Sequence, residues 1–75
     1  MKELLETVEK ALVSNPDAVS VNEIDNGDSI VLELSVAQED MGKVIGRQGR
    51  IAKAIRAVMK AASLKENKKV SVEIL

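Results

Sequence analysis

Two glycines three residues apart, Gly46 and Gly49, constrain the fold of this chain more than any other feature. They lie between a short helical pattern and a longer one that runs to about residue 63. Glycine adopts the left-handed backbone conformations that end a helix and open a sharp turn, which other residues resist. After the second glycine, an apolar stripe at helical spacing comprises Ile51, Ile55, Val58, Met59 and Ala62. The sequence therefore predicts two helices joined by a tight glycine turn.

The rest of the chain predicts one more helix and three strands. We expect helices over residues 2–14, 38–45 and 49–63, and strands over residues 18–24, 29–36 and 69–75. Alternation is clearest in the second strand, which directs to one face Ile30, Leu32, Leu34 and Val36. Between the first two strands lies Asp25-Asn26-Gly27-Asp28, in which Asn-Gly is a strong signal for a two-residue hairpin turn. These two strands should pair antiparallel.

The order helix-strand-strand-helix-helix-strand indicates an α+β fold in a single domain over residues 1–75. The last crossover passes through two helices, so the second and third strands should lie parallel, with the second strand in the centre. We expect a three-stranded mixed sheet with the helices packed on one face. A chain of 75 residues is near the lower limit for a self-sufficient core, so a partner surface would not be surprising.

The composition argues against several classes of function. The chain has no Cys and no His, which removes thiolate chemistry, the commonest general base and the commonest metal ligand. The carboxylates lie mostly on the first helix and the hairpin, so we expect no catalytic site, no metal and no cofactor. No apolar stretch approaches the roughly 18 residues of a membrane span, and the N-terminus lacks a signal peptide's apolar run. The expected location is the cytoplasm.

Charge divides the chain into two unlike halves. Residues 1–40 hold two lysines and ten acidic residues, for a net charge of −8. Residues 41–75 hold nine basic residues and two acidic ones, for a net charge of +7. Such asymmetry hints at a polyanionic partner for the basic half, although in a generic domain a solvated helix face is the commoner explanation. The basic residues lie around the glycine turn, and that position favours a polyanionic partner.

The glycine turn has the parts that contact with a phosphate backbone requires. Gly46 and Gly49 remove two side chains, and the helix that begins near Gly49 offers unpaired N–H groups at the positive end of its dipole. Arg47 and Gln48 lie at the tip and can donate hydrogen bonds to phosphate or sugar oxygens. A positive field is added on either side by Lys43, Arg50 and Lys53. None of these parts requires a particular base.

The segment Gly42-Lys43-Val44-Ile45-Gly46-Arg47-Gln48-Gly49-Arg50-Ile51 resembles the signature of the KH domain. The predicted element order resembles its type II, prokaryotic arrangement. Because one such domain fills the chain, the sequence is similar to the small bacterial single-KH RNA-binding proteins of the KhpA family. The resemblance implies a groove beside the glycine loop that holds about four nucleotides of single-stranded RNA.

Site residues and partners follow from the resemblance. The loop residues carry over as Gly46, Arg47, Gln48 and Gly49, while Ile45 and Ile51 could belong to the floor of the groove or to the core. The resemblance also implies RNA-chaperone-like behaviour and pairing with a second copy of the chain or with a second KH-containing protein. With no aromatic residue to stack on bases, we expect permissive sequence recognition. Which strand edge would meet the bases stays open.

Other interpretations remain at this stage. Ala54, Ala57 and Ala61 form a small apolar strip that is either a dimer surface or simply a run of good helix formers. A helix-hairpin-helix module would bind DNA backbone through a glycine turn, but its glycines are usually two residues apart. A KH fold could also serve only as a protein-interaction subunit, although such domains tend to lose a loop glycine or gain acids there.

Overall fold

The computed structural model describes residues 1–75, and its elements follow the predicted order. The helices and strands are α1 (Lys2–Leu12), β1 (Ser20–Asp25), β2 (Ser29–Ser35), α2 (Met41–Ile45), α3 (Arg50–Ser63) and β3 (Lys69–Ile74). Single turns of 3₁₀-helix precede β1, α2 and α3, at Pro16–Ala18, Gln38–Asp40 and Arg47–Gly49. None of the helices combines the length and the apolar character that crossing a membrane requires.

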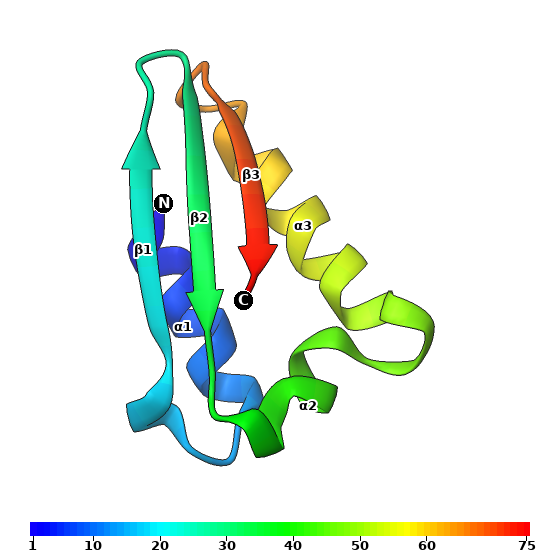
Figure 1. Cartoon of the computed structure of the whole chain (residues 1–75). Coiled ribbons are helices and arrows are strands. Elements are labelled where there is room, and N and C mark those ends of the chain that lie inside the picture. The colour runs from blue at the N-terminus through cyan, green and yellow to red at the C-terminus, as the bar shows by residue number, and fades with distance from the viewer.

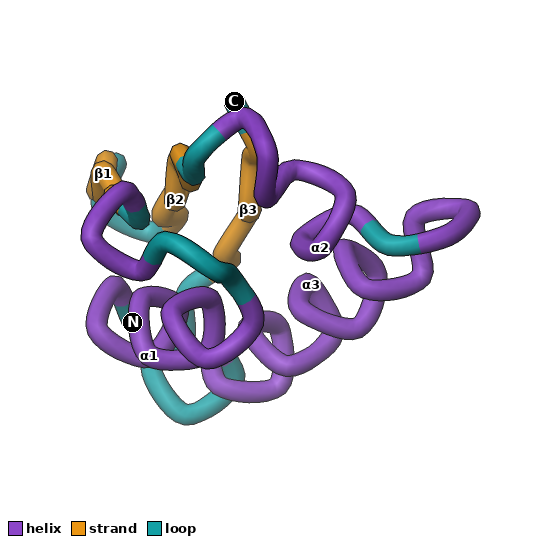
Figure 2. Tube along the Cα trace, turned by 90° about the horizontal axis from the view of Figure 1, so that it is seen from below, coloured by secondary structure: helices purple, strands orange, loops and turns teal.

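The strands form one mixed sheet in the order β1-β2-β3, which confirms the predicted α+β fold with a central second strand. β1 runs antiparallel to β2 with Val21 opposite Leu34, and β3 runs parallel to β2 with Val72 opposite Leu32. α1 and α3 lie on the same face of this sheet, and α2 lies beyond the end where β2 finishes (Figures 1 and 2). β3 therefore has one free edge, on the side of α3.

The core lies between the sheet and the two long helices. Alternate residues of β2 are fully or nearly buried, as the sequence pattern predicts. Eight buried residues make up the core: Leu5, Val21, Ile30, Leu32, Leu34, Ile55, Met59 and Val72. Every one of them is aliphatic or Met, so the absence of aromatic residues leaves the core to side chains of medium size.

The β1–β2 hairpin is one residue out of step with its sequence signal. Asp25 pairs with Ile30 across the strands, and the Asn26 N–H donates to the Ser29 carbonyl at 2.8 Å. The two central residues are therefore Gly27 and Asp28 rather than Asn26 and Gly27. Gly27 has φ of 94°, and a glycine at the first central position suits a primed hairpin turn as well as Asn-Gly does.

Helix α1 buries only part of the apolar stripe at helical spacing that its sequence predicts, which comprises Leu4, Leu5, Val8, Leu12 and Val13. Leu5 is fully buried, but Leu4 and Leu12 are each 39% exposed. The position one turn after Leu5 is Glu9, whose side chain is fully buried and whose two carboxylate oxygens have no hydrogen-bond partner. Burial raises the pKa of Glu9 to about 7, because removal from water disfavours the charged form.

Candidate nucleic-acid interface

The glycine turn is built from backbone conformations that side chains resist. Helix α2 ends at Gly46, whose N–H donates to the Gly42 carbonyl at 2.8 Å and whose φ and ψ are 75° and 172°. Gln48 and Gly49 then both adopt left-handed conformations, with φ of 57° and 73°. Helix α3 starts at Arg50 with no side chain capping its first N–H groups. In Figures 1 and 2 the turn projects away from the body of the domain.

The two glycines are needed for different reasons. A Cβ on Gly46 would lie 2.6 Å from the Ile51 Cγ1, so this position faces the protein and is filled by Ile51. A Cβ on Gly49 would meet nothing within 4 Å, and only its positive φ favours glycine. A side chain at Gly46 would therefore meet Ile51 rather than an approaching strand, and the part of Gly46 in phosphate contact stays a prediction. Only Gly49 leaves open space outside the turn.

The two isoleucines beside the turn separate into different roles. Ile51 is half-buried, packs against the core and fills the space into which a side chain at Gly46 would point. Ile45, the last residue of α2, is 37% exposed and belongs to the surface next to the turn. Of the two assignments that the sequence left open, the structure gives Ile51 to the core.

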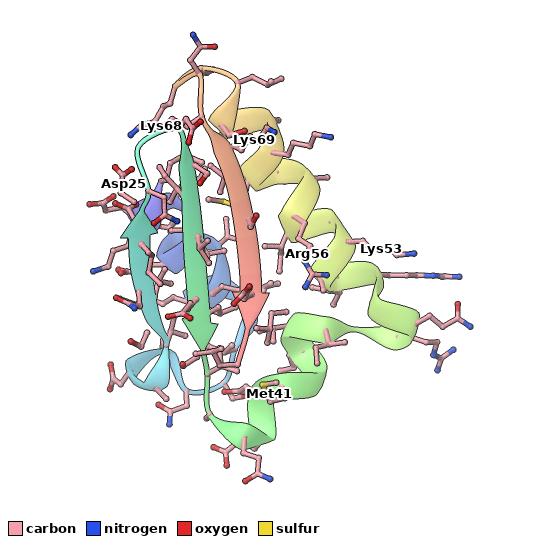
Figure 3. All side chains as sticks on the ribbon, turned by 45° about the horizontal axis from the view of Figure 1, so that its top comes forward. Asp25, Met41, Lys53, Arg56, Lys68 and Lys69 are labelled. Atoms are coloured by element: carbon pink, nitrogen blue, oxygen red, sulfur yellow. The ribbon has the colours of Figure 1, made fainter.

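Basic and polar side chains around the turn are free of carboxylate partners. Arg47 and Gln48 at the tip are exposed, and their side chains make no hydrogen bond or ion pair within the protein. Arg50 and Lys53, on the first turn of α3, are also exposed and unpaired. Figure 3 shows the Lys53 side chain directed away from the sheet. The turn therefore presents three cations and one amide to solvent.

Lys43 does not join this group. Its Nζ lies 3.6 Å from Oδ1 of the buried Asp40 and contacts the Ser14 hydroxyl. Asp40 in turn accepts hydrogen bonds from the backbone N–H groups of Ser14 and Asn15, each at 3.0 Å. Donation from Ser14 is the main reason why the pKa of Asp40 lies below its ordinary value. Lys43 thus connects α2 with the loop after α1. Asp40, three residues before Lys43, was the feature of the sequence from which this pairing could have been predicted.

A groove that sequence analysis did not assign lies between α3 and the free edge of β3. Its lining is Arg56, Lys60, Val70, Ser71 and Val72. The Arg56 Nε donates to the Val72 carbonyl at 3.3 Å, and Figure 3 shows this side chain directed toward β3. Arg56 and Lys60 lie three and seven residues after Lys53, so the three cations share one side of α3. This helical spacing of basic residues was the feature of the sequence from which the groove could have been predicted.

The predicted alanine strip borders an apolar cleft between α1 and α3. The cleft is lined by Val8, Leu12, Arg50, Ile51, Ala54, Ile55 and Val58. Val58 was expected in the core but is 48% exposed here, and Leu12 is 39% exposed on the opposite wall. Ala57 and Ala61 are exposed and do not line the cleft. Only Ala54 of the three alanines therefore contributes to it.

A family model described as KhpA/KhpB, KH domain, matches residues 2–74. The chain belongs to this family of KH domains. It is 67% identical over all 75 residues to RNA-binding protein KhpA of Caldanaerobacter subterraneus subsp. tengcongensis, and 67% identical to that of Clostridium acetobutylicum, covering each protein completely. RNA-binding protein KhpA of Listeria monocytogenes is 45% identical over 75 residues, which cover all of this chain and 99% of that protein. These KH proteins are binding proteins and not an enzyme family.

The KH fold also appears in solved structures of a larger protein. A crystal structure of Aquifex aeolicus Era bound to GDP.AlF4- matches with a TM-score of 0.66 and 19% identity. A second Era structure, in complex with MgGDPNP and nucleotides 1506–1542 of 16S ribosomal RNA, matches equally well. Each match covers 97% of this chain and 28% of the Era chain. At this identity the likeness shows a common fold.

Proposed function

We propose that this protein binds single-stranded RNA, with the glycine turn contacting the sugar-phosphate backbone. The close relatives are named RNA-binding protein KhpA, and KH domains as a class hold about four nucleotides at the GxxG loop. The observation that carries the proposal is the turn itself. Arg47, Gln48 and Arg50 are exposed and unpaired there, beside the open position at Gly49.

The first N–H groups of α3 add to this site. They have no side-chain cap and lie at the positive end of the dipole of a 14-residue helix. Uncapped N–H groups at such a position attract a phosphate. Backbone contacts of this kind position a strand without distinguishing its bases. Lys53 extends the positive surface one turn further along the helix.

We assign base contact to the free edge of β3. The Lys69 N–H donates to the Asp28 carbonyl, and the Leu75 N–H donates to the Leu34 carbonyl. The backbone N–H and C=O groups of the odd-numbered residues of β3 therefore face β2. Backbone groups of the alternate residues, including Val72, then face α3. The Val72 carbonyl already receives a hydrogen bond from Arg56 across the groove. Bases lying between α3 and β3 would meet these groups and an aliphatic floor.

This arrangement favours modest sequence specificity and RNA-chaperone-like behaviour, and we propose the cytoplasm as its location. The chain has no aromatic residue to stack on bases, and most of the proposed contacts are to the backbone. A permissive site of this kind would bind many unpaired segments transiently. Affinity from one domain should be modest, and a second linked KH domain would raise it through effective concentration.

The experiment is a titration of short single-stranded RNA at two salt concentrations. We expect weak binding that declines as salt rises, because counterions released from the RNA drive it. The Arg47→Asp/Gln48→Asp variant should lose binding and keep its circular-dichroism spectrum. The Lys10→Asp variant is the control, since it adds negative charge at an exposed position of α1 away from the turn. Unchanged binding by the double variant would refute the site, and preference for double-stranded DNA would favour the helix-hairpin-helix alternative.

We propose, second, that the domain pairs with another KH domain through the cleft between α1 and α3. Six of the seven residues that line this cleft are apolar, and the exposed Leu12 and Val58 lie on its two walls. Exposed apolar surface on a small domain is typical of an association site. The family description names KhpA and KhpB together, which is consistent with a self-pair or a mixed pair. If RNA does not bind, this assembly role becomes the favoured function.

A further inference from the structure

The groove beside the proposed RNA site continues along α3 toward the hairpin end of the domain. Its first section contains Lys60, Val70 and Ser71, which also line the adjoining hollow. That hollow adds Ser63, Leu64, Lys68 and Lys69, and these four also line a third hollow that reaches Asn67, Asp28 and Ser29. Because each hollow shares residues with the next, they form one continuous path between α3 and β3. We refer to the part from Lys60 to Lys69 as the distal groove.

The distal groove is positively charged and has a definite end. Lys60 and Lys69 line it, are exposed, and have no carboxylate partner. Lys68 also lines it but is paired with Asp25 at 3.1 Å, and Asp28 lies at the far mouth. Figure 3 shows Lys68 and Lys69 at the same end of the domain as Asp25. A polyanion could follow the groove to Lys69 and would be repelled beyond it.

Distance separates this cation pair from the glycine turn. Lys60 is eleven residues after Gly49, which is about 16 Å along a helix. Lys69 lies further on, because it precedes Val72 by three residues, or about 10 Å, along β3. A GxxG loop clamps about four nucleotides whose bases are unstacked. Lys69 therefore lies where a strand bound at the turn would leave the four-nucleotide site.

We propose that the distal groove binds the phosphates of the same RNA strand as it leaves the site at the glycine turn. Lys60 and Lys69 would each contact a phosphate, which extends the bound segment by about two nucleotides. The Ser71 hydroxyl, exposed between them on β3, is free to donate to the backbone. This inference rests on the proposed RNA-binding function, and it adds a site at the opposite end of α3. The strand runs from the turn toward the hairpin and ends before Asp28.

The test asks whether Lys69 contributes to affinity only when the RNA is long enough to reach it. Fluorescein-labelled oligouridylates of four, six, eight and twelve nucleotides are titrated into the parent chain, the Lys69→Gln variant and a Lys10→Gln control. Lys10 is exposed on α1 and has no carboxylate partner, so it matches the change in charge away from the groove. Circular dichroism checks that all three proteins share one fold.

We expect the parent to gain affinity between four and eight nucleotides by more than the added number of binding registers explains. The Lys69→Gln variant should keep the parent's affinity for the four-nucleotide RNA and lose about fivefold for the eight-nucleotide RNA at 0.1 M salt. Its salt dependence on the longer RNA should fall by a slope of about 0.7, the value for one phosphate contact. The Lys10→Gln control should match the parent at each length.

Three outcomes would overturn the inference, and they differ in what else they imply. Equal parental affinity for four and eight nucleotides refutes the distal groove and leaves the glycine turn intact. Equal weakening of every length by Lys69→Gln shows that Lys69 acts only as part of a general positive field. Failure of the parent to bind any of the RNAs removes the proposed function itself, and the distal groove with it.

Discussion

Gly46 and Ile51 are in direct contact across the turn, and a Cβ on Gly46 would overlap the Ile51 side chain at 2.6 Å. The first glycine therefore serves the fold, because it lets the turn close over the residue that begins the buried side of α3. Gly49 has no such neighbour, and only its positive φ favours glycine at this position. One motif thus combines a packing requirement with a surface requirement.

Replacing each glycine by alanine should separate these requirements. Gly46→Ala combines the overlap with Ile51 and a φ/ψ region that only glycine readily adopts, so we expect it to destabilise the fold by about 3 kcal/mol or more. Gly49→Ala should cost only about 1–2 kcal/mol for a left-handed residue, and should weaken RNA binding by placing a methyl group at the open position. Urea unfolding measures the first effect, and RNA titration measures the second. Equal destabilisation by both would contradict the contact.

Lys43 and Arg50 should behave in opposite ways although both flank the turn. Lys43→Gln removes the cation that pairs with Asp40, so we expect a lower urea midpoint and nearly unchanged RNA affinity. Arg50→Gln removes an unpaired cation, so we expect an unchanged midpoint and about fivefold weaker binding at 0.1 M salt. Each variant is the other's control. A larger loss of RNA affinity from Lys43→Gln than from Arg50→Gln would show that the Asp40 pair opens on binding.

The free energy of unfolding should decrease as pH rises, because Glu9 is buried. Its pKa is raised from 4.5 to about 7 in the folded state, so the proton is held more tightly by the folded protein than by the unfolded one. The contribution is complete below the unfolded value and is lost as pH rises through about 7, which amounts to at most about 3 kcal/mol. Glu9→Gln should remove this component. The difference in free energy of unfolding between parent and variant, measured by urea at pH 5 and pH 8, should change sharply, and parallel profiles would refute it.

The cleft between α1 and α3 yields a prediction about assembly. Val58→Asp introduces a charge on an exposed wall of the cleft, so we expect sedimentation to show a shift from dimer to monomer. Leu64→Asp is the matched control, because Leu64 is 77% exposed and lies outside the cleft. If the parent is already monomeric at high concentration, self-pairing through this face is excluded, and a mixed pair is then the case to test.

Periodic apolar patterning predicted the element order and the sheet, because alternation in β2 and helical spacing in α3 each specify one buried face. It could not orient α1, where the buried position after Leu5 is occupied by a carboxylate and two leucines remain partly exposed. Nor could it separate the roles of two glycines whose difference lies in a neighbour five residues away. Sequence analysis grouped Lys43 with the cations of the turn because it did not pair Lys43 with Asp40 three residues earlier, and a part for Lys43 in RNA contact stays a prediction.

The most direct test of the RNA site is a series of amide NMR spectra recorded while a four-nucleotide oligouridylate is added. We predict that the largest shift changes fall on the turn from Gly46 to Lys53 and on the free edge of β3 around Val72, with small changes along α1. Changes concentrated instead on Val8, Leu12 and Val58, with the glycine turn unaffected, would contradict the account.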